Sequence, residues 1–318
     1  MIKTPFDHMK LALEAEEKSL HPTHKVGALI CGYDNSDHFY AIAHANHWPP
    51  LLEQHIGRET KLGKASTTVH AEVAAILKAP ATDGAEIYVT DLPCPNCAKI
   101  MAEARIKTIY IDSHTHNTPL GKKLKPFFDD ISLPILQSAG IQVFEMDCEQ
   151  STIHELGELQ TNILRPIERP VHHIPLEGGQ IHIDHFNAMI EEQHAVLNAP
   201  FAACYAKSDL DQYTFLCAQS HRSMGLTKNQ AEEISAAQNK YTPTIQPINR
   251  LLLTCARYGL KIDENYLYSS QTPSSREFVN LIGAGYTSLS IGDKTKCIDE
   301  WGIMALKQLT NHNILKLI

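Results

Sequence analysis

Two short stretches organise this chain, His70-Ala71-Glu72 and Pro93-Cys94-Pro95-Asn96-Cys97. One imidazole and two thiolates are a usual set of three protein ligands for Zn2+, and catalytic sites leave the fourth position to water. A carboxylate two residues after the histidine does not share its place on a helix, but it can face that open position and carry protons. We therefore expect one catalytic Zn2+ per chain, with the ligands His70, Cys94 and Cys97 and the proton carrier Glu72.

Two other interpretations of the cysteine pair explain less of the sequence. A structural zinc knuckle needs a fourth ligand, and none stands at a standard spacing near His70. A redox C-x-x-C pair would leave the H-x-E stretch without a role. The pair also opens a predicted helix, whose N-terminal dipole favours thiolates. The pattern thus favours a catalytic metal.

The hydrophobic pattern around the two stretches alternates between helix and strand periods. We expect helices over residues 6–19, 69–78, 94–105 and 133–139, and strands over 26–31, 39–43, 86–90, 108–112 and 141–145. This alternation predicts an α/β protein with a three-layer α/β/α fold and a mixed central sheet that is largely parallel in its second half.

The pattern starts again after residues 148–180, a segment with several prolines that we predict as a linker. An offset of 178 residues places Tyr266-Leu267 on Tyr88-Val89, with similar apolar runs on either side. We therefore predict a duplicated fold, with a catalytic zinc domain over residues 1–147 and a second copy over residues 181–318. An unrelated α/β domain with the same hydrophobic rhythm is the alternative.

The second copy lacks every predicted ligand at that offset. It places Ile248 on the histidine, Arg250 on the glutamate, and Thr272 and Ser275 on the two cysteines. None of these side chains replaces an imidazole, a thiolate or a proton-carrying carboxylate. We expect the second domain to be degenerate and non-catalytic.

Composition narrows the classes of partner. The formal net charge is −8 and only 7% of the residues are aromatic, which argues against a general affinity for nucleic acid. No apolar run is long enough to span a bilayer, and the polar N-terminus does not resemble a signal peptide. The eight cysteines show no disulfide spacing, as in a reducing compartment. We expect a cytoplasmic protein without a membrane partner.

The N-terminal part of the chain resembles the cytidine/deoxycytidylate deaminase superfamily. Within it, Tyr88-Val89-Thr90, the run Pro93-Cys94-Pro95-Asn96-Cys97-Ala98-Lys99 and Ile106-Lys107 are most similar to deoxycytidylate deaminases. The resemblance implies a zinc-dependent hydrolase in which zinc-bound water attacks C4 of cytosine, converting dCMP to dUMP and ammonia. It also implies that Asn46 contacts the sugar or base, although His44 stands where the family has glycine, and that the Ala71 N–H contacts the pyrimidine carbonyl.

Several points stay open in the sequence. The alternatives to a nucleotide deaminase are a base deaminase acting on tRNA or single-stranded nucleic acid, and a non-catalytic, zinc-stabilised regulatory module. The packing surface that such domains commonly need could come from a homo-oligomer or from the second half of the same chain. No motif marks a phosphate-binding residue, and the candidate cations are Lys25, Arg58, Lys61 and Lys64.

Overall fold

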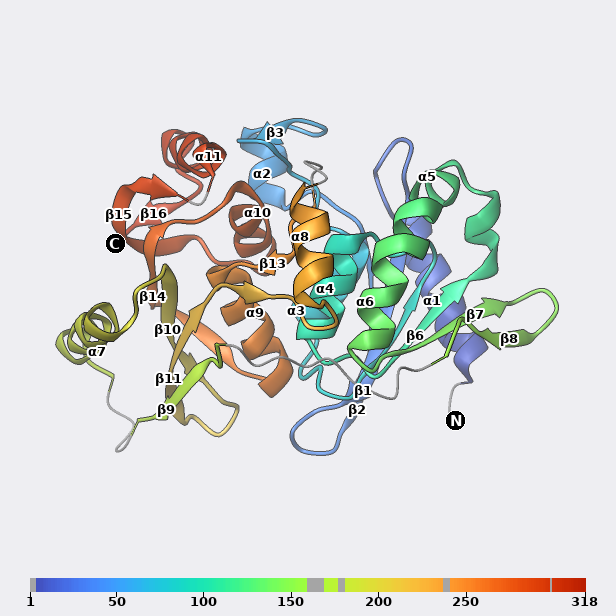
Figure 1. The fold of residues 1–318 in the computed structure, drawn as a ribbon, viewed down its shortest axis with the longest axis horizontal. Helices are drawn as coiled ribbons and strands as arrows, with labels where there is room; N and C mark the ends of the chain where they lie inside the picture. The colour runs from blue at the N-terminus through green and yellow to red at the C-terminus, as the bar shows by residue number, and fades with distance from the viewer. Residues whose placement is uncertain (1–3, 159–168, 177–180, 237–240, 298) are drawn as a thin grey trace.

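The computed structural model describes residues 4–158, 169–176, 181–236, 241–297 and 299–318, which contain two six-stranded mixed sheets (Figure 1). The strands of the first half are β1 (Gly27–Tyr33), β2 (Phe39–Ala45), β5 (Glu86–Val89), β6 (Thr108–Asp112), β7 (Gln142–Asp147), β8 (Thr152–Glu155) and the small hairpin β3 (Lys61–Leu62) and β4 (Ala65–Ser66). Its helices are α1 (Pro5–Glu17), α2 (Pro50–His55), α3 (Ala71–Lys78), α4 (Pro95–Glu103), η1 (Ser113–Asn117), α5 (Pro119–Phe127), η2 (Phe128–Ser132) and α6 (Leu133–Ser138).

The first sheet has the strand order β2-β1-β5-β6-β7-β8. Strand β1 is antiparallel to β2 and β5, whereas β5, β6 and β7 are parallel to one another. Alternate residues of β1 face opposite sides, because successive side chains of a strand point to opposite faces. Leu29 packs with Met9 of α1, and Ala28 and Ile30 belong to the core that includes α3 and α4. The predicted three-layer class with a mixed sheet is confirmed.

The second half repeats this architecture. Its strands are β9 (His172–Pro175), β10 (Phe201–Lys207), β11 (Tyr213–Gln219), β14 (Lys261–Thr272), β15 (Ser288–Cys297), β16 (Lys316–Leu317) and the short pair β12 (His221–Arg222) and β13 (Thr244–Ile245). Its helices are α7 (Ile183–Val196), α8 (Lys228–Ala236), α9 (Pro247–Tyr258), α10 (Ser275–Ala284) and α11 (Glu300–Asn311). No helix among the described residues is long and apolar enough to cross a membrane.

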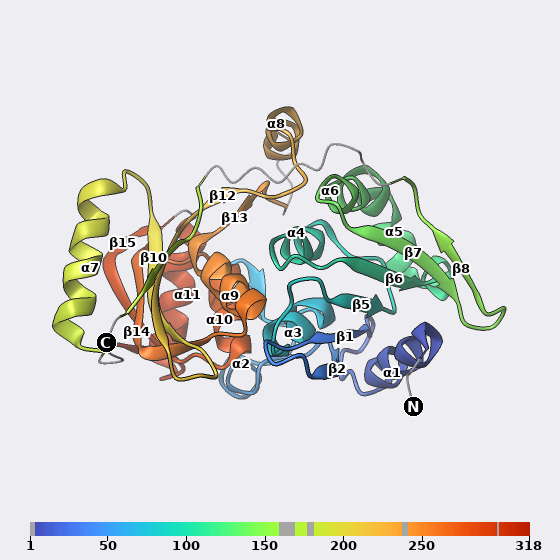
Figure 2. The same ribbon diagram turned by 90° about the horizontal axis from the view of Figure 1, so that it is seen from below.

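Five strands of each sheet match in order and direction, while the sixth strands, β8 and β9, lie at opposite edges. The order β11-β10-β14-β15-β16 corresponds to β2-β1-β5-β6-β7, and each corresponding pair of neighbours is parallel or antiparallel in both halves. Helix α7 covers one face of the second sheet, as α1 covers one face of the first (Figure 2). The duplication predicted from the hydrophobic rhythm is therefore present in the topology.

The uniform offset of 178 residues is wrong in detail. Ala202 pairs with Ser269 in the second sheet as Ala28 pairs with Val89 in the first, and Ser274 rather than Thr272 takes the N-cap position that Cys94 has in α4. The offset drifts because the connections differ, with the β3–β4 hairpin in one half and β12, α8 and β13 in the other.

The segment predicted as a linker contributes a strand to each sheet. Strand β8 pairs with β7 at the edge of the first sheet, and β9 pairs with β11 at the edge of the second. Both strands lie within residues 148–180, so parts of this segment are integrated into the two sheets. The domain boundaries at 147 and 181 stay a prediction.

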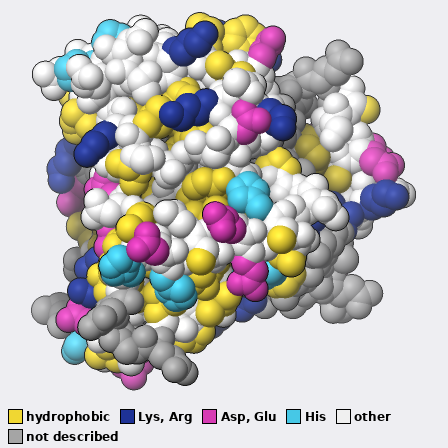
Figure 3. Space-filling view, turned by 90° about the vertical axis from the view of Figure 1, so that its left-hand side faces the viewer, with side chains coloured by type: hydrophobic (Ala, Val, Ile, Leu, Met, Phe, Trp, Pro, Cys, Tyr) yellow, Lys and Arg dark blue, Asp and Glu magenta, His cyan; other side chains and the backbone are white. Residues whose placement is uncertain are grey.

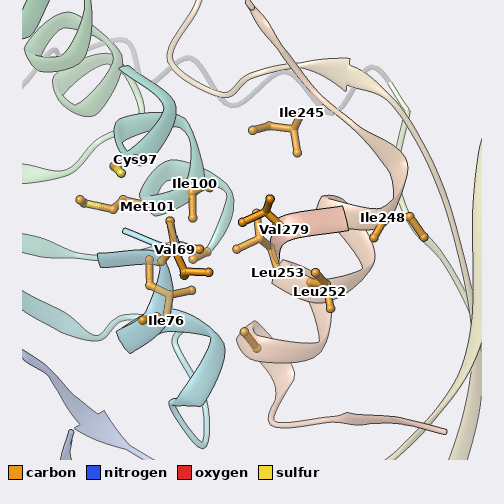
Figure 4. Packing of buried hydrophobic residues seen from close by; sticks show 14 of the residues in the cluster. Val69, Ile76, Cys97, Ile100, Met101, Ile245, Ile248, Leu252, Leu253 and Val279 are labelled. Carbon is orange, nitrogen blue, oxygen red and sulfur yellow. The ribbon is translucent and has the colours of Figure 1, made fainter. Parts of the chain in front are cut away.

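The two halves share one hydrophobic core. Helices α3 and α4 face α9 and α10 between the two sheets (Figure 2). Figure 4 shows the buried side chains that meet there, among them Val69, Ile76, Ile100, Met101, Ile245, Leu252, Leu253 and Val279. Because burial of such side chains is the main favourable term in association, each half supplies the packing surface of the other.

Candidate metal centre

The predicted ligands lie at the N-termini of two neighbouring helices. His70 is the N-cap of α3, and Cys94 is the N-cap of α4, both with extended backbone conformations. Cys97 lies in the first turn of α4. The free N–H groups and the dipole of a helix N-terminus stabilise negative charge, so this position suits thiolates.

The three donor atoms are close enough to share one metal ion. His70 Nδ1 lies 3.2 Å from Cys97 Sγ and 3.7 Å from Cys94 Sγ, and the two sulfurs are 3.6 Å apart. Tetrahedral zinc with ordinary Zn–S and Zn–N bonds separates such donors by roughly 3.5–3.8 Å. The donor set and its spacing therefore fit Zn2+, and among the described residues these three form the cluster that could hold a metal.

His70, Cys94 and Cys97 shift one another's pKa values. The hydrogen bond between the two sulfurs lowers the pKa of Cys94 well below the usual thiol range, while that bond and burial raise the pKa of Cys97. Burial alone would lower the pKa of His70, but the charge of Cys94 and its hydrogen bond raise it. Metal ligands bind as thiolates and neutral imidazole, so binding of a divalent cation here would release protons from these groups.

Glu72 lies beside the donors, in the first turn of α3. Its side chain is buried, and burial raises the pKa of this carboxyl, an effect opposed by the positive charge of His70. A carboxyl whose pKa is raised can both accept and return a proton near neutral pH. The arrangement supplies a proton carrier next to three metal donors.

The two predicted substrate contacts differ in how much of their hydrogen-bonding capacity is free. Asn46 Oδ1 accepts from Ser19 Oγ at 2.7 Å and from Val26 N at 3.0 Å, while Nδ2 donates to the His24 carbonyl at 2.8 Å. The Asn46 side chain thus keeps one N–H for a ligand. Ala71 is the first residue of α3, where the backbone N–H has no intrahelical partner.

Three stacked rings, His21, His24 and Trp48, lie next to Asn46 and are called the aromatic wall here. The sequence pattern did not identify them as a group. Trp48 stacks on His21 with ring centroids 5.4 Å apart, and His21 stacks on His24. Trp48 Nε1 and His24 Nδ1 are buried and have no hydrogen-bond partner in the part of the chain that the structure describes. A backbone bridge between His47 and Val69 ties this wall to the residue before His70. These side chains come from two loops, so no short spacing in the sequence predicts that they meet.

The second half fills the corresponding place with a carboxylate. Glu277 and Ser274 form a capping box at the N-terminus of α10, where α4 has its two cysteines. Glu277 Oε1 also accepts from the backbone N–H of Ile248 at the N-terminus of α9. One buried carboxylate therefore joins the two helix N-termini that three metal donors join in the first half.

The sequence comparisons agree with the site. Residues 3–113 match the family model for the cytidine and deoxycytidylate deaminase zinc-binding region. The deoxycytidylate deaminases of Enterobacteria phages T2 and T4 are each 41% identical over 83 residues, which make up 24% of this chain and 38% and 37% of those proteins. ComE operon protein 2 of Bacillus subtilis (strain 168) is 33% identical over 90 residues, 27% of this chain and 42% of that protein. This chain spans less than half the length of these relatives.

A solved structure is similar over the length of one half. The dCMP deaminase from the cyanophage S-TIM5, in complex with dCMP and dUMP, is 25% identical in sequence. The match covers 46% of this chain and 100% of that chain, with a TM-score of 0.31.

Proposed function

We propose that this chain, whose residues 3–113 match the family model for the cytidine and deoxycytidylate deaminase zinc-binding region, is a zinc-dependent hydrolase that deaminates a cytosine nucleotide, dCMP, to dUMP and ammonia. The observation that carries the proposal is the cluster of His70, Cys94 and Cys97 with the buried Glu72 beside it. A purely structural zinc site closes all four positions with protein ligands and needs no such carboxylate.

The residues of the site divide the chemistry among them. His70, Cys94 and Cys97 would hold Zn2+, which when bound supplies the Lewis acidity that makes water a nucleophile at neutral pH. Glu72 takes a proton from the attacking water and delivers it to the ring nitrogen. It then takes the proton of the hydroxyl formed at C4 and delivers it to the amino group, which leaves as ammonia. The Ala71 N–H and the remaining N–H of Asn46 orient the ring and sugar by hydrogen bonds.

The domain assignment follows from the same argument. Residues 1–147 are the catalytic domain, and residues 181–318 form a non-catalytic copy whose Ser274 and Glu277 stand in place of metal donors. The second half then serves as the packing partner of the first within one chain.

The charge distribution favours a small-molecule substrate over a polymer. The net charge is −8, and Figure 3 shows basic and acidic side chains interspersed over the face formed by the second half. A groove that tracks a nucleic-acid backbone gathers positive charge instead. A cytosine-containing oligonucleotide is therefore a necessary arm of the substrate test.

Ammonia release from a substrate panel tests the proposal. The panel consists of cytosine, deoxycytidine, dCMP, dCTP and the oligonucleotide, and dCMP should give the highest kcat/KM. Glu72→Gln should lower kcat by roughly 10²–10⁴-fold while one zinc per chain is retained. The matched control is Glu149→Gln, at an exposed turn. Full activity of the Glu72→Gln variant, or fastest turnover of the oligonucleotide, would contradict the proposal.

A further inference from the structure

An arginine of the second half reaches the metal centre of the first. Arg276 lies in the first turn of α10, and its Nη1 donates to the backbone carbonyl of Thr68 at 3.0 Å. Thr68 precedes the ligand His70 by two residues, and Val69 between them is held by the backbone bridge to His47. The guanidinium is thus fixed at the edge of the metal centre, across the interface between the halves.

Arg276 has no acidic partner among the described residues. Three other arginines do: Arg250 pairs with Glu103, Arg58 with Glu53 and Arg105 with Asp83. Burial lowers the pKa of Arg276, and the charges that oppose this shift are the thiolates of Cys94 and Cys97. Arginine nevertheless stays a cation in proteins. A partly buried guanidinium that pairs with no carboxylate among the described residues favours an anion as its ligand.

Arg276 donates to one acceptor among the described residues, the Thr68 carbonyl. A guanidinium carries five N–H groups in a fixed fork, and the bond to Thr68 uses one of them. This single bond orients the plane and leaves donors for two oxygens of a tetrahedral anion, a geometry for which arginine is well suited. Two of the cations considered from the sequence are already engaged: Arg58 pairs with Glu53, and Lys64 lies over the ring of Trp301 at 5.9 Å.

We propose that Arg276 binds the phosphate of the nucleotide substrate, so that the half without metal ligands completes the substrate site of the other half. The inference rests on the proposed function and extends it, since it explains selection of a nucleotide over a nucleoside. It also gives the second half a role beyond packing. Arg276 is here a specificity-determining residue, while Glu72 and the metal donors carry the chemistry.

Steady-state kinetics on dCMP and deoxycytidine test the assignment. Arg276→Ala should raise the KM for dCMP by roughly 30-fold or more, because a hydrogen-bonded charge pair is lost, and should leave kcat/KM for deoxycytidine within about twofold. Arg276→Lys keeps the charge but not the fork, so its KM for dCMP should lie between those of the wild type and the alanine variant. The matched control is Arg250→Ala, which breaks another arginine contact between the halves and should lower stability without discriminating between the two substrates.

Two outcomes would overturn the inference. An equal loss for dCMP and deoxycytidine, or loss of zinc from Arg276→Ala, would mean that Arg276 only positions the segment carrying His70. Calorimetric binding of dCMP and deoxycytidine to the Glu72→Gln protein, with and without Arg276→Ala, separates this failure from failure of the proposed function. If the wild type deaminates no cytosine compound but binds dCMP through Arg276, the phosphate site stands and the reaction is wrong. If deamination is seen but dCMP binding is unaffected by Arg276→Ala, the phosphate site is wrong.

Discussion

Replacing Glu103 by glutamine should loosen the interface between the two halves. Glu103 ends α4 in the first half, and both of its carboxylate oxygens are used by the second half. Oε2 lies 2.8 Å from His221 Nε2 and Oε1 lies 3.3 Å from Arg250 Nε. The three side chains are 3%, 1% and 4% exposed, respectively. Water therefore cannot replace the carboxylate once its charge is removed.

The magnitude follows from this burial. Glutamine keeps the size of the side chain, but it leaves the Arg250 cation buried without a counter-charge and turns an NH2 group toward one of two donors. Removing one partner of a buried pair costs about 3–5 kcal/mol, far more than the pair contributes relative to apolar residues. In domains of about 150–250 residues each kcal/mol shifts Tm by roughly 2–4 °C, so a decrease of roughly 6–20 °C is expected.

The contribution of Glu103 also depends on pH. Burial alone would raise the pKa of this carboxyl, but the hydrogen bond and charge of His221 and the charge of Arg250 lower it below its ordinary value of 4.5. A group whose folded-state pKa is lowered stabilises the protein fully above its unfolded pKa, and this stabilisation is lost as the pH falls through the folded value. The Tm difference between the wild type and Glu103→Gln should therefore be constant above pH 4.5 and shrink below it.

Thermal unfolding followed by circular dichroism and calorimetry measures this difference. The control is Asp129→Asn, which breaks the exposed pair of Lys125 and Asp129 and should cost less than about 1 kcal/mol. If Glu103→Gln unfolds at the wild-type temperature, or if its deficit persists unchanged in acid, the buried network does not hold the halves together.

Three further predictions concern the metal and the frame around it. Cys97→Ser should reduce bound zinc from one per chain to almost none by metal analysis, and an unchanged zinc content would show that the three-donor cluster is not the site. Ser274→Ala removes the cap of α10 and should lower the free energy of unfolding by roughly 1 kcal/mol in a denaturant titration, with zinc retained. Loss of zinc from this variant would show that the cap of α10 is needed for metal binding in the first half. Gly27→Ala would place a Cβ 2.0 Å from the Ala12 carbonyl of α1, so expression as soluble, folded protein should fall sharply, and a wild-type Tm would refute the tight α1–β1 contact.

The candidate metal centre was predictable because zinc ligation requires particular residue types, and these stand at short, characteristic spacings in the sequence. A zinc site of this kind needs imidazole and thiolate donors. When such residues open two predicted helices, the helix N-termini are favourable places for the thiolates. The class of fold followed for a similar reason, since the periods of helix and strand are local properties of the chain. The distances around His70 fit a tetrahedral ion, and the topology repeats in the second half as the hydrophobic rhythm indicated.

The detailed correspondence between the halves could not be read from the rhythm. Loops of different length separate matching elements, so a fixed offset placed Thr272 where the structure has Ser274 at the helix N-cap. The role of Glu277 was hidden for the same reason. Its carboxylate joins two helices through backbone N–H groups, and such contacts leave no signature in a sequence.

His70-Ala71-Glu72 and the cysteine pair by themselves predicted which residues could hold a metal and which carboxylate lies beside them, because ligand chemistry constrains residue identity. Only the tertiary structure brought the second half against the segment that carries His70. Arg276 meets Thr68, and Glu103 meets Arg250, between residues far apart in the chain. These contacts arise because two similar domains bury the same helical faces against each other, and the resulting proximity depends on packing rather than on any local pattern.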